Sequence, residues 1–426
     1  MGNRNAESLN GDHMHVARVG IEALNAYAGP LYVSVRDVFE ARGLDLTRFN
    51  NLAMDKKSVG LPCEDAVSYA VNAAKPIIDR LSPEEKARIE TVITVTESPV
   101  DFGKSLSTYV HDLLGLHPNC RLMEIKQACY AGTAALQVAL GIVGSGFSPG
   151  GKVLVICTDI ARAVARDTYA EPTQAAGAVA MLVSDRPNLL EIDPGASGRH
   201  SYEVMDVCRP LAELETGDPD LSLLSYLDCL EKSFQQYATT VDGADFRTTF
   251  DYFAFHTPFA GMVRGAHRRM MRKFAKAAPA EIESDFTKRL APSLTYCTEV
   301  GNIYAGTVFL ALAGVIHGAE LGASSRVGMF SYGSGCSSEF FSGLIPGTAP
   351  SSLAQMNIGP ELDRRVRLDV ARYDQILDLN AEWPFGVKDK VVDCGPFADL
   401  HEQFFAGKGL LTLTAIKNYH REYAFS

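Results

Sequence analysis

One cysteine in this chain precedes a run of residues that carries no charge. The run extends from Ala131 to Val143, and Cys129 lies just before it, after the polar stretch Glu124–Gln127. A helix N-terminus favours the thiolate of a cysteine, and the thiolate is the form that attacks an acyl carbonyl. Most free cysteines, however, are buried and only pack in a core. The local pattern makes Cys129 a candidate nucleophile, with core packing as the competing interpretation.

Two more reactive side chains follow short apolar runs. Glu97 comes after the β-branched run Thr91–Thr96, and His256 comes after Asp251–Phe255. Catalytic residues of α/β folds collect at the carboxyl ends of strands, which makes both residues candidates for acid–base chemistry. An ordinary loop glutamate and a hydrogen-bonded core histidine are the competing interpretations.

A cysteine, a carboxylate and a histidine suit the formation of a carbon–carbon bond from a thioester. Such a reaction needs a nucleophile that holds the acyl group, a base that removes a proton beside the thioester carbonyl, and an acid for the new alkoxide. A carboxylate must be unusually basic to remove that proton. We therefore expect Glu97 to be partly desolvated and to have a raised pKa.

Two weaker signals lie in the second half of the chain. A glycine-rich stretch, Ser331–Gly335, follows a strand expected at Arg326–Phe330, and glycine lets backbone N–H groups approach a ligand closely. Basic residues within Arg268–Lys273 recur at helical spacing. They form either a solvated helix face or a positive surface for an anionic partner.

Expected strands alternate with expected helices along the chain, which predicts a layered α/β fold. We predict strands at residues 16–25, 91–96, 152–158, 177–183, 251–255, 326–330 and 409–416. We predict helices at residues 34–42, with Ser34 as N-cap, 72–81, 104–114, 131–143, 221–237, 308–316 and 362–376. The uncharged helix after Cys129 is expected to be buried on all sides.

Each half of the chain carries a strand, a reactive residue and a small-residue helix, so we predict one duplicated fold. Its halves are residues 16–185, with Glu97 and Cys129, and residues 186–426, with His256 and Asn302. The first 15 residues are polar and rich in glycine and asparagine, and we expect a disordered tail or an expression remnant there.

Composition excludes several classes of protein. Hydrophobic residues make up 46% and charged residues 21% of the chain, as in a globular protein and unlike a disordered one. A net charge of −11 disfavours nucleic acid and anionic membranes as partners. The nine cysteines lack CxxC spacing, which argues against a disulfide framework and a zinc site and favours reduced thiols in the cytoplasm. No apolar run is long enough to span a membrane.

Five motifs follow one another along the chain. They are Thr96-Glu97-Ser98 with Asp101 and Lys104-Ser105, Lys126–Tyr130 with Gly132-Thr133, Phe255–Phe259, Gly301–Tyr304 and Ser331–Gly335. Taken together and in this order, they resemble the motifs of the 3-hydroxy-3-methylglutaryl-CoA (HMG-CoA) synthase family of the thiolase superfamily. The resemblance covers nearly the whole chain from Val16. It implies a thiolase-like duplicated αβαβα layered fold and, with the long apolar stretches beside the motifs, a homodimer.

The resemblance also implies roles for individual residues. Glu97 would be the general base and acid, Cys129 the acylated nucleophile and His256 the group that positions and polarises the acceptor. The remaining substrate-binding candidates are Asn302, which would hydrogen-bond the acceptor carbonyl, Tyr304 in the same motif, Ser331, Gly333 and Ser334, whose loop would form an oxyanion hole with the Cys129 N–H, and Asp159 in a supporting role.

Departures from the primary-metabolism pattern resemble the branch of the family that works in polyketide β-branching. Where the family commonly has a lysine that helps to hold CoA, this chain has Gly261, and a segment after Asp159 is longer and adds Arg162 and Arg166. Gly60–Asp65 also resembles that branch. The implied substrates are an acetyl group on a donor acyl carrier protein and a β-ketoacyl group on an acceptor carrier protein, with phosphopantetheine as the carrier arm and no tightly bound cofactor or metal.

Charge and position suggest which residues would contact the phosphopantetheine or its carrier protein. They are Arg264, Arg268 and Arg269, together with Arg36 and Arg48.

Three alternatives remain open. One is an HMG-CoA synthase that uses acetyl-CoA and acetoacetyl-CoA. Another is a decarboxylating β-ketoacyl synthase III-like enzyme, which would use His256 and Asn302 but leave Glu97 idle. The third, from another class, is a silent scaffold that only docks carrier proteins.

Overall fold

A nine-stranded sheet organises the computed structural model, which describes residues 18–161, 165–211, 214–381 and 385–426. The strand order is β11-β12-β13-β8-β1-β7-β6-β4-β5. One arm consists of β1 (Gly20–Tyr27), β4 (Ile89–Val95), β5 (Arg121–Ile125), β6 (Lys152–Asp159) and β7 (Gly177–Ser184). The other consists of β8 (Leu190–Ser201), β11 (Tyr252–Phe255), β12 (Ser324–Gly333) and β13 (Ser337–Pro346).

The two arms repeat one pairing pattern. In the first arm β4 and β6 are parallel, and β7 pairs antiparallel with both β6 and β1. In the second arm β11 and β12 are parallel, and β13 pairs antiparallel with both β12 and β8. The arms join where Gly20 and Ile21 of β1 pair with Glu191 and Leu190 of β8. This repeat confirms the predicted duplicated α/β fold, and the boundary at residues 185 and 186 stays a prediction.

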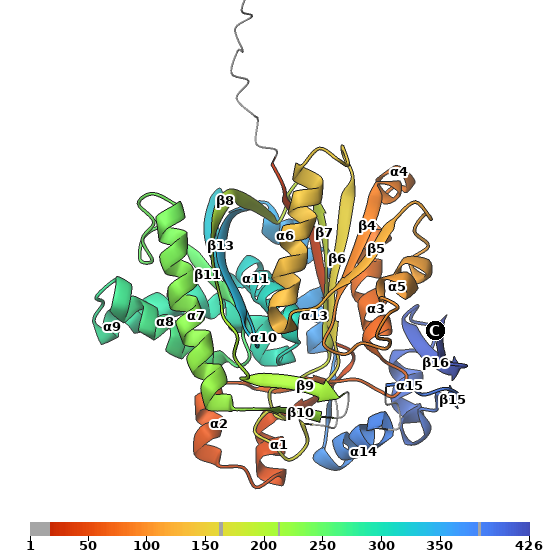
Figure 1. Ribbon diagram of the computed structural model, residues 1–426. Helices are drawn as coiled ribbons and strands as arrows, with labels where there is room; N and C mark the ends of the chain where they lie inside the picture. The colour runs from red at the N-terminus through yellow and green to blue at the C-terminus, as the bar shows by residue number, and fades with distance from the viewer. Residues whose placement is uncertain (1–17, 162–164, 212–213, 382–384) are drawn as a thin grey trace, which may run out of the picture.

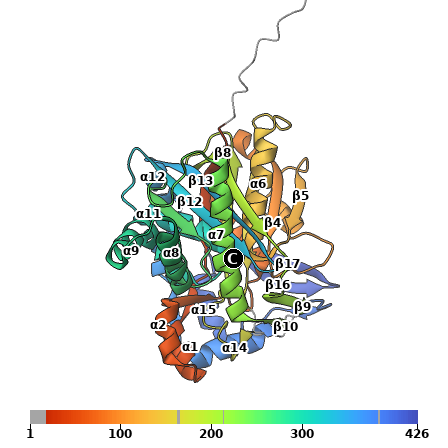
Figure 2. The same ribbon diagram turned by 60° about the vertical axis from the view of Figure 1, so that its left-hand side comes forward.

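The sheet turns where β1 meets β8, so its arms face each other across two central helices (Figure 1). α6 (Ala131–Gly144) packs on β6 and β7, and α11 (Thr307–Gly318) packs on β11 and β12. α3 (Ala66–Ile78) and α5 (Ser107–Leu113) cover the outside of the first arm, while α7 (Pro219–Thr240) and α8 (Ala260–Phe274) cover the second (Figures 1 and 2). The result is the predicted series of helix and strand layers.

The central helices differ in burial. The first ten residues of α11 are all buried, as a run without charge predicts. α6 is buried only on one side, because Val138 is 40% exposed. The prediction that the helix after Cys129 is buried on all sides is therefore wrong.

Smaller units surround the layers. The sheet β14-β2-β3 joins β2 (Leu31–Ser34), β3 (Lys56–Val59) and β14 (Val366–Leu368), and the sheet β15-β16-β17 joins β15 (Lys390–Val391), β16 (Leu411–Lys417) and β17 (His420–Phe425). β9 (Val207–Leu211) and β10 (Leu214–Gly217) form a hairpin. The other α-helices are α1 (Val35–Ala41), α2 (Leu46–Leu52), α4 (Pro83–Ala87), α9 (Pro279–Asp285), α10 (Leu294–Val300), α12 (Ala349–Ala354), α13 (Ile358–Asp363), α14 (Val370–Ala381) and α15 (Ala398–Phe404).

Several element boundaries differ from the predicted ones. α1 begins after Ser34, whose hydroxyl caps it as predicted. The helix predicted at 362–376 is instead α13, β14 and α14, because β14 adds a strand beside β2. The strand predicted to end at Phe330 continues to Gly333, so Ser331 lies inside it. β1 begins at Gly20, and Val16 and Arg162 lie outside the described residues. Among the described residues no helix is long and apolar enough to cross a membrane.

Candidate active site

Cys129 lies in a short turn that leads directly into α6. This turn, η1 (Ala128–Tyr130), follows β5 and begins with Ala128 at a φ of +44°. Cys129 is half-buried, and its thiol donates a hydrogen bond to Oε1 of Glu97 at 3.2 Å. Glu97 is also half-buried and follows β4. The structure thus brings together the two residues that the sequence placed at a helix start and a strand end.

Burial has the largest effect on the pKa values of both Glu97 and Cys129. Desolvation raises the pKa of Glu97, as predicted for a carboxylate that acts as a base. The pKa of the Cys129 thiol is raised well above its ordinary value by desolvation and then by the negative charge of Glu97. Burial and the charge of Glu97 thus oppose the thiolate that the helix N-terminus favours. The thiol instead keeps its proton, which points at the carboxylate that would accept it.

Asp159 holds the segment that carries Glu97. Its buried Oδ1 accepts hydrogen bonds from the Glu97 backbone N–H at 2.7 Å, the Ser98 hydroxyl at 3.1 Å and the Thr96 hydroxyl at 3.2 Å. Burial, followed by the nearby charge of Glu97, raises the pKa of Asp159 well above its ordinary value. These contacts fit the supporting role that the resemblance implies.

Arg209, on β9, is a site residue that the sequence analysis missed. Its Nη1 donates to the backbone carbonyl of Glu97 at 2.9 Å and its Nη2 to the Tyr304 hydroxyl at 2.9 Å. Its Nε donates to Glu215 of β10 at 2.7 Å. The positive charge of Arg209 lowers the pKa of Glu97 and so opposes desolvation. Residues 186–245 show weak periodicity, which gave no local signal for this hairpin.

Asn302 and Tyr304 precede α11 much as Cys129 precedes α6. The turn η5 (Tyr304–Gly306) also begins with a positive φ, +53° at Tyr304. Oδ1 of Asn302 accepts from the Tyr304 N–H at 2.9 Å and from the Thr307 hydroxyl at 3.1 Å. Because Oδ1 faces these two donors, the Asn302 NH₂ group is left to donate to a carbonyl.

His256 is a buried, neutral imidazole. Burial lowers its pKa to about 3. Its backbone is fixed by bonds to the Phe330 carbonyl at 2.8 Å and from the Tyr226 hydroxyl at 2.8 Å. Its Nδ1 is buried and has no hydrogen-bond partner among the residues that the structure describes. No hydrogen bond within the described part of the chain joins His256 to Cys129 or Glu97.

The end of β12 lies against the Cys129 turn. A Cβ added to Gly333 would approach the Tyr130 nitrogen to 2.5 Å and the Gln127 carbonyl to 2.6 Å, so only glycine fits. Gln127 also donates to the Ser334 carbonyl at 3.5 Å. Ser331 is fully buried, and within residues 18–161, 165–211, 214–381 and 385–426 its hydroxyl has no hydrogen-bond partner. Gly333 and Ser334 are therefore near Cys129, as expected, whereas Ser331 is inside the strand.

The five arginines assigned to carrier contact do not form one free cluster. Arg264 and Arg268 both face Glu283 of α9, at 2.5 and 3.9 Å. Arg269 faces the other side of α8 and pairs with Glu231 of α7 at 3.2 Å. Arg36 lies over the Phe49 ring at 4.5 Å and Arg48 over the Tyr169 ring at 4.6 Å. The negative partners offset much of the charge that α8 carries.

Close packing explains why residue 261 is a glycine. A Cβ at this position would lie 1.7 Å from the Asn51 carbonyl oxygen, because the end of α2 runs against the start of α8. A lysine side chain would therefore displace α2. Arg166, in turn, pairs with Asp378 of α14 at 2.7 Å.

Comparisons with known proteins agree with this geometry. Sequence profiles described as hydroxymethylglutaryl-coenzyme A synthase N terminal and C terminal match residues 15–188 and 272–391. The polyketide biosynthesis 3-hydroxy-3-methylglutaryl-ACP synthase PksG of Bacillus subtilis is 48% identical over 95% of this chain and 98% of its own. The hydroxymethylglutaryl-CoA synthase of Enterococcus faecalis is 34% identical over 84% of this chain and 90% of its own.

A solved structure gives the same result. The HMG synthase of the curacin biosynthetic pathway, in complex with apo donor-ACP, superposes with a TM-score of 0.93 at 52% identity, and the match covers 96% of this chain and 100% of that one.

Fold and site together define a carbon–carbon bond-forming acyltransferase with a thiolase-like fold. The chain belongs to the hydroxymethylglutaryl-CoA synthase family.

Proposed function

We propose that this enzyme makes an HMG-type branched acyl group on an acyl carrier protein during polyketide synthesis. The observation that carries the proposal is its whole-length likeness to synthases named for ACP, at 48% identity against 34% for the CoA enzyme. The tight packing of Gly261 on Asn51 supports it, because the lysine that would help to hold CoA has no room.

The reaction begins with transfer of an acetyl group to Cys129. The Cys129 proton passes to Glu97, 3.2 Å away, and the thiolate attacks the acetyl carbonyl of the donor. The carbon–sulfur bond to phosphopantetheine breaks, and the released thiolate takes a proton. Backbone N–H groups at Cys129 and at the Ser331–Gly335 segment would stabilise the oxyanion.

Condensation then joins two carbon atoms. Glu97 removes a proton from the acetyl methyl group, and the enolate carbon attacks the β-ketone of the acceptor. The ketone oxygen becomes an alkoxide and takes a proton from Glu97. His256 and the Asn302 NH₂ group would hydrogen-bond the acceptor and position it, while Tyr304 and Asp159 hold the surrounding groups. Water finally cleaves the Cys129 thioester, which leaves a carboxylate on the product.

The carrier proteins would dock near α1, α2 and α8, which adjoin where Gly261 meets Asn51. Arg36 and Arg48 belong to α1 and α2, and Arg264 and Arg268 to α8. An acidic carrier domain would compete with Glu283 for Arg264 and Arg268. Arg269 contributes least, because it faces Glu231.

We further propose that the enzyme is a cytoplasmic homodimer. β5 is the outermost strand of the sheet, and beside it Val138 is 40% and Phe147 90% exposed. A second copy would cover this apolar surface and extend the sheet. Light scattering after size exclusion should give twice the chain mass, and a monomer would refute this part.

The deciding experiment compares acetyl donors. Intact-mass spectrometry follows acetylation of Cys129 by acetyl-ACP and by acetyl-CoA at equal concentration, with Cys129→Ser as control. Faster loading from acetyl-ACP is expected. Equal loading would favour an enzyme that uses free CoA esters, and no loading would favour a scaffold. Arg264→Ala with Arg268→Glu should slow only the ACP reaction.

A further inference from the structure

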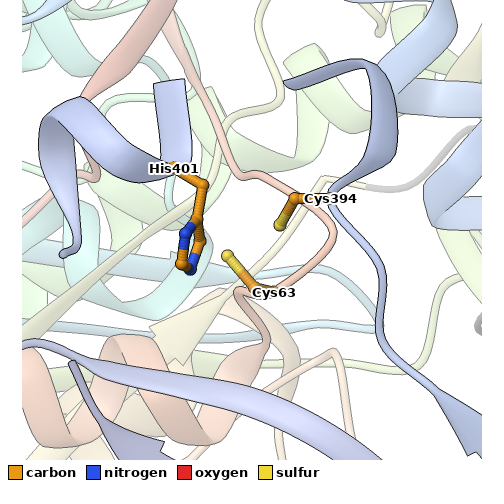
Figure 3. A group of neighbouring side chains, drawn as sticks. All are labelled: Cys63, Cys394 and His401. Carbon is orange, nitrogen blue, oxygen red and sulfur yellow. The ribbon is translucent and has the colours of Figure 1, made fainter. Parts of the chain in front are cut away.

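Three metal-binding side chains converge far from the catalytic pair in sequence. Cys63 lies in the loop between β3 and α3, Cys394 follows β15 and His401 belongs to α15. Their ligand atoms all lie within 4.8 Å of one another, and the side chains point toward a common centre (Figure 3). The cysteines are more than 300 residues apart, so no local spacing predicts this cluster.

The dimensions of the cluster suit a zinc ion. Zn–S bonds of about 2.3 Å and Zn–N bonds of about 2.0–2.1 Å place tetrahedral ligand atoms roughly 3.4–3.8 Å apart. The three ligand atoms lie within 4.8 Å of one another, which exceeds this range by at most about 1 Å. Two thiols and an imidazole form a soft donor set, which prefers zinc to magnesium or calcium.

The surroundings leave the cluster available to an ion. Cys63 is 3% exposed and packs with Phe397 and Leu400 in one apolar core, while Cys394 and His401 are half-buried. The nearby carboxylates have other partners. Glu64 accepts from the Tyr27 hydroxyl at 2.8 Å and the Leu61 N–H at 3.0 Å, and Asp393 accepts from the Gly395 N–H at 2.7 Å. Among the described residues no fourth side chain joins the set, so a water molecule would complete it.

We propose that Cys63, Cys394 and His401 bind one Zn²⁺ ion, which fastens the C-terminal segment from β15 to α15 onto the loop before α3. On binding, each cysteine loses its thiol proton to solvent and forms a sulfur–zinc bond, and neutral His401 donates a nitrogen lone pair. The ion is structural and takes no part in acyl transfer. The competing state, a Cys63–Cys394 disulfide, would need an oxidant and would leave His401 without a role.

The test uses the Cys129→Ser enzyme, so that the nucleophile cannot bind metal. The protein is stripped with a chelator, supplied with zinc sulfate and desalted, and its zinc is measured by mass spectrometry. About one zinc ion per chain is expected. Adding Cys394→Ser or His401→Ala should abolish retention. Cys120→Ser is the matched control, because this half-buried cysteine lies outside the cluster and should leave zinc content unchanged.

A second readout needs no ligand substitution. Cobalt added to the stripped Cys129→Ser protein should give a thiolate-to-cobalt charge-transfer band that zinc removes, and zinc should raise the melting temperature. Three results would each overturn the proposal. They are absence of zinc and of the cobalt band while both thiols react freely, a mass two hydrogens lower that maps to a Cys63–Cys394 disulfide, and full zinc retention in Cys394→Ser.

Discussion

The two arms of the sheet present different chemistry at equivalent places. β4 and β11 occupy matching positions, and Glu97 follows the first while His256 follows the second. The central helices match as well. α6 follows the turn with Cys129, and α11 follows the turn with Tyr304, each turn beginning at a positive φ.

The two arms differ in whether their side chains change protonation or covalent state during the reaction. The first arm carries groups that exchange protons or form bonds, namely Glu97 and Cys129, with Asp159 bonded beneath them. The second arm carries neutral hydrogen-bonding groups, because burial lowers the pKa of His256 to about 3 and Asn302 is an amide. We infer that duplication separated covalent and proton-transfer chemistry from substrate positioning, and four variants test this division.

Cys129→Ala should have the largest effect. Without the thiol no acyl-enzyme forms, and turnover should fall by at least roughly 10⁴-fold, as for other lost nucleophiles. Intact-mass spectrometry with acetyl-ACP checks this, with Cys120→Ser as a control that should still load. Acetyl appearing on the Cys129→Ala protein would show that another residue is the nucleophile.

Glu97→Gln should have the next largest effect and should lower the rate of condensation by about 10²–10⁴-fold. The expected signature is an acetyl-enzyme that forms slowly and no longer exchanges its methyl protons with D₂O. Since the base must be ionised and desolvation raises its pKa, the wild-type rate should decline as pH falls through a value above that of an ordinary glutamate. Normal methyl exchange in Glu97→Gln would remove Glu97 from this role.

His256→Ala should lower condensation by about 10²-fold, the effect of one lost hydrogen-bond donor in an active site. Acetyl loading and methyl exchange, which belong to the first arm, should persist. Because His256 is neutral, it should add no inflection to the rate between about pH 5 and 8. If His256→Ala could not be acetylated at Cys129, the proposed division of chemistry between the two arms would be wrong.

Much of the fold was predictable because its central strands are short runs with buried β-branched residues. β4, β6 and β7 lie where the sequence placed them. β14 was missed because three residues beside β2 carry too little pattern, and the charged stretch around them favours a helix. Propensity alone cannot detect a strand that exists only through its partner.

The site was predictable as a set of residues, but its electrostatics were not. Glu97, Cys129 and His256 lie at ends of elements that the sequence reveals. The pKa of Cys129 depends on burial and on a carboxylate 32 residues away, and the helix N-terminus alone reveals neither. Arg209 was missed because only the packing of its hairpin over the site brings it to Glu97 and Tyr304.

Arg209→Met should have the smallest effect, and it sharpens the comparison because Arg209 contacts both arms. Its positive charge lowers the pKa of Glu97, while the charge of Glu215, which would keep only its hydrogen bond from Gln174, raises it. The pH below which the rate falls, because Glu97 becomes protonated, should therefore be higher in the variant. A shift of about one pH unit would lower the rate at acidic pH roughly tenfold. Arg209→Lys keeps the positive charge, so its rate should fall at the same pH as that of the wild type even if Tyr304 loses its hydrogen bond. If Arg209 had a purely structural role, its replacement would lower the rate equally at every pH. An unchanged pH dependence in Arg209→Met would therefore show that the charge of Arg209 does not control the pKa of Glu97.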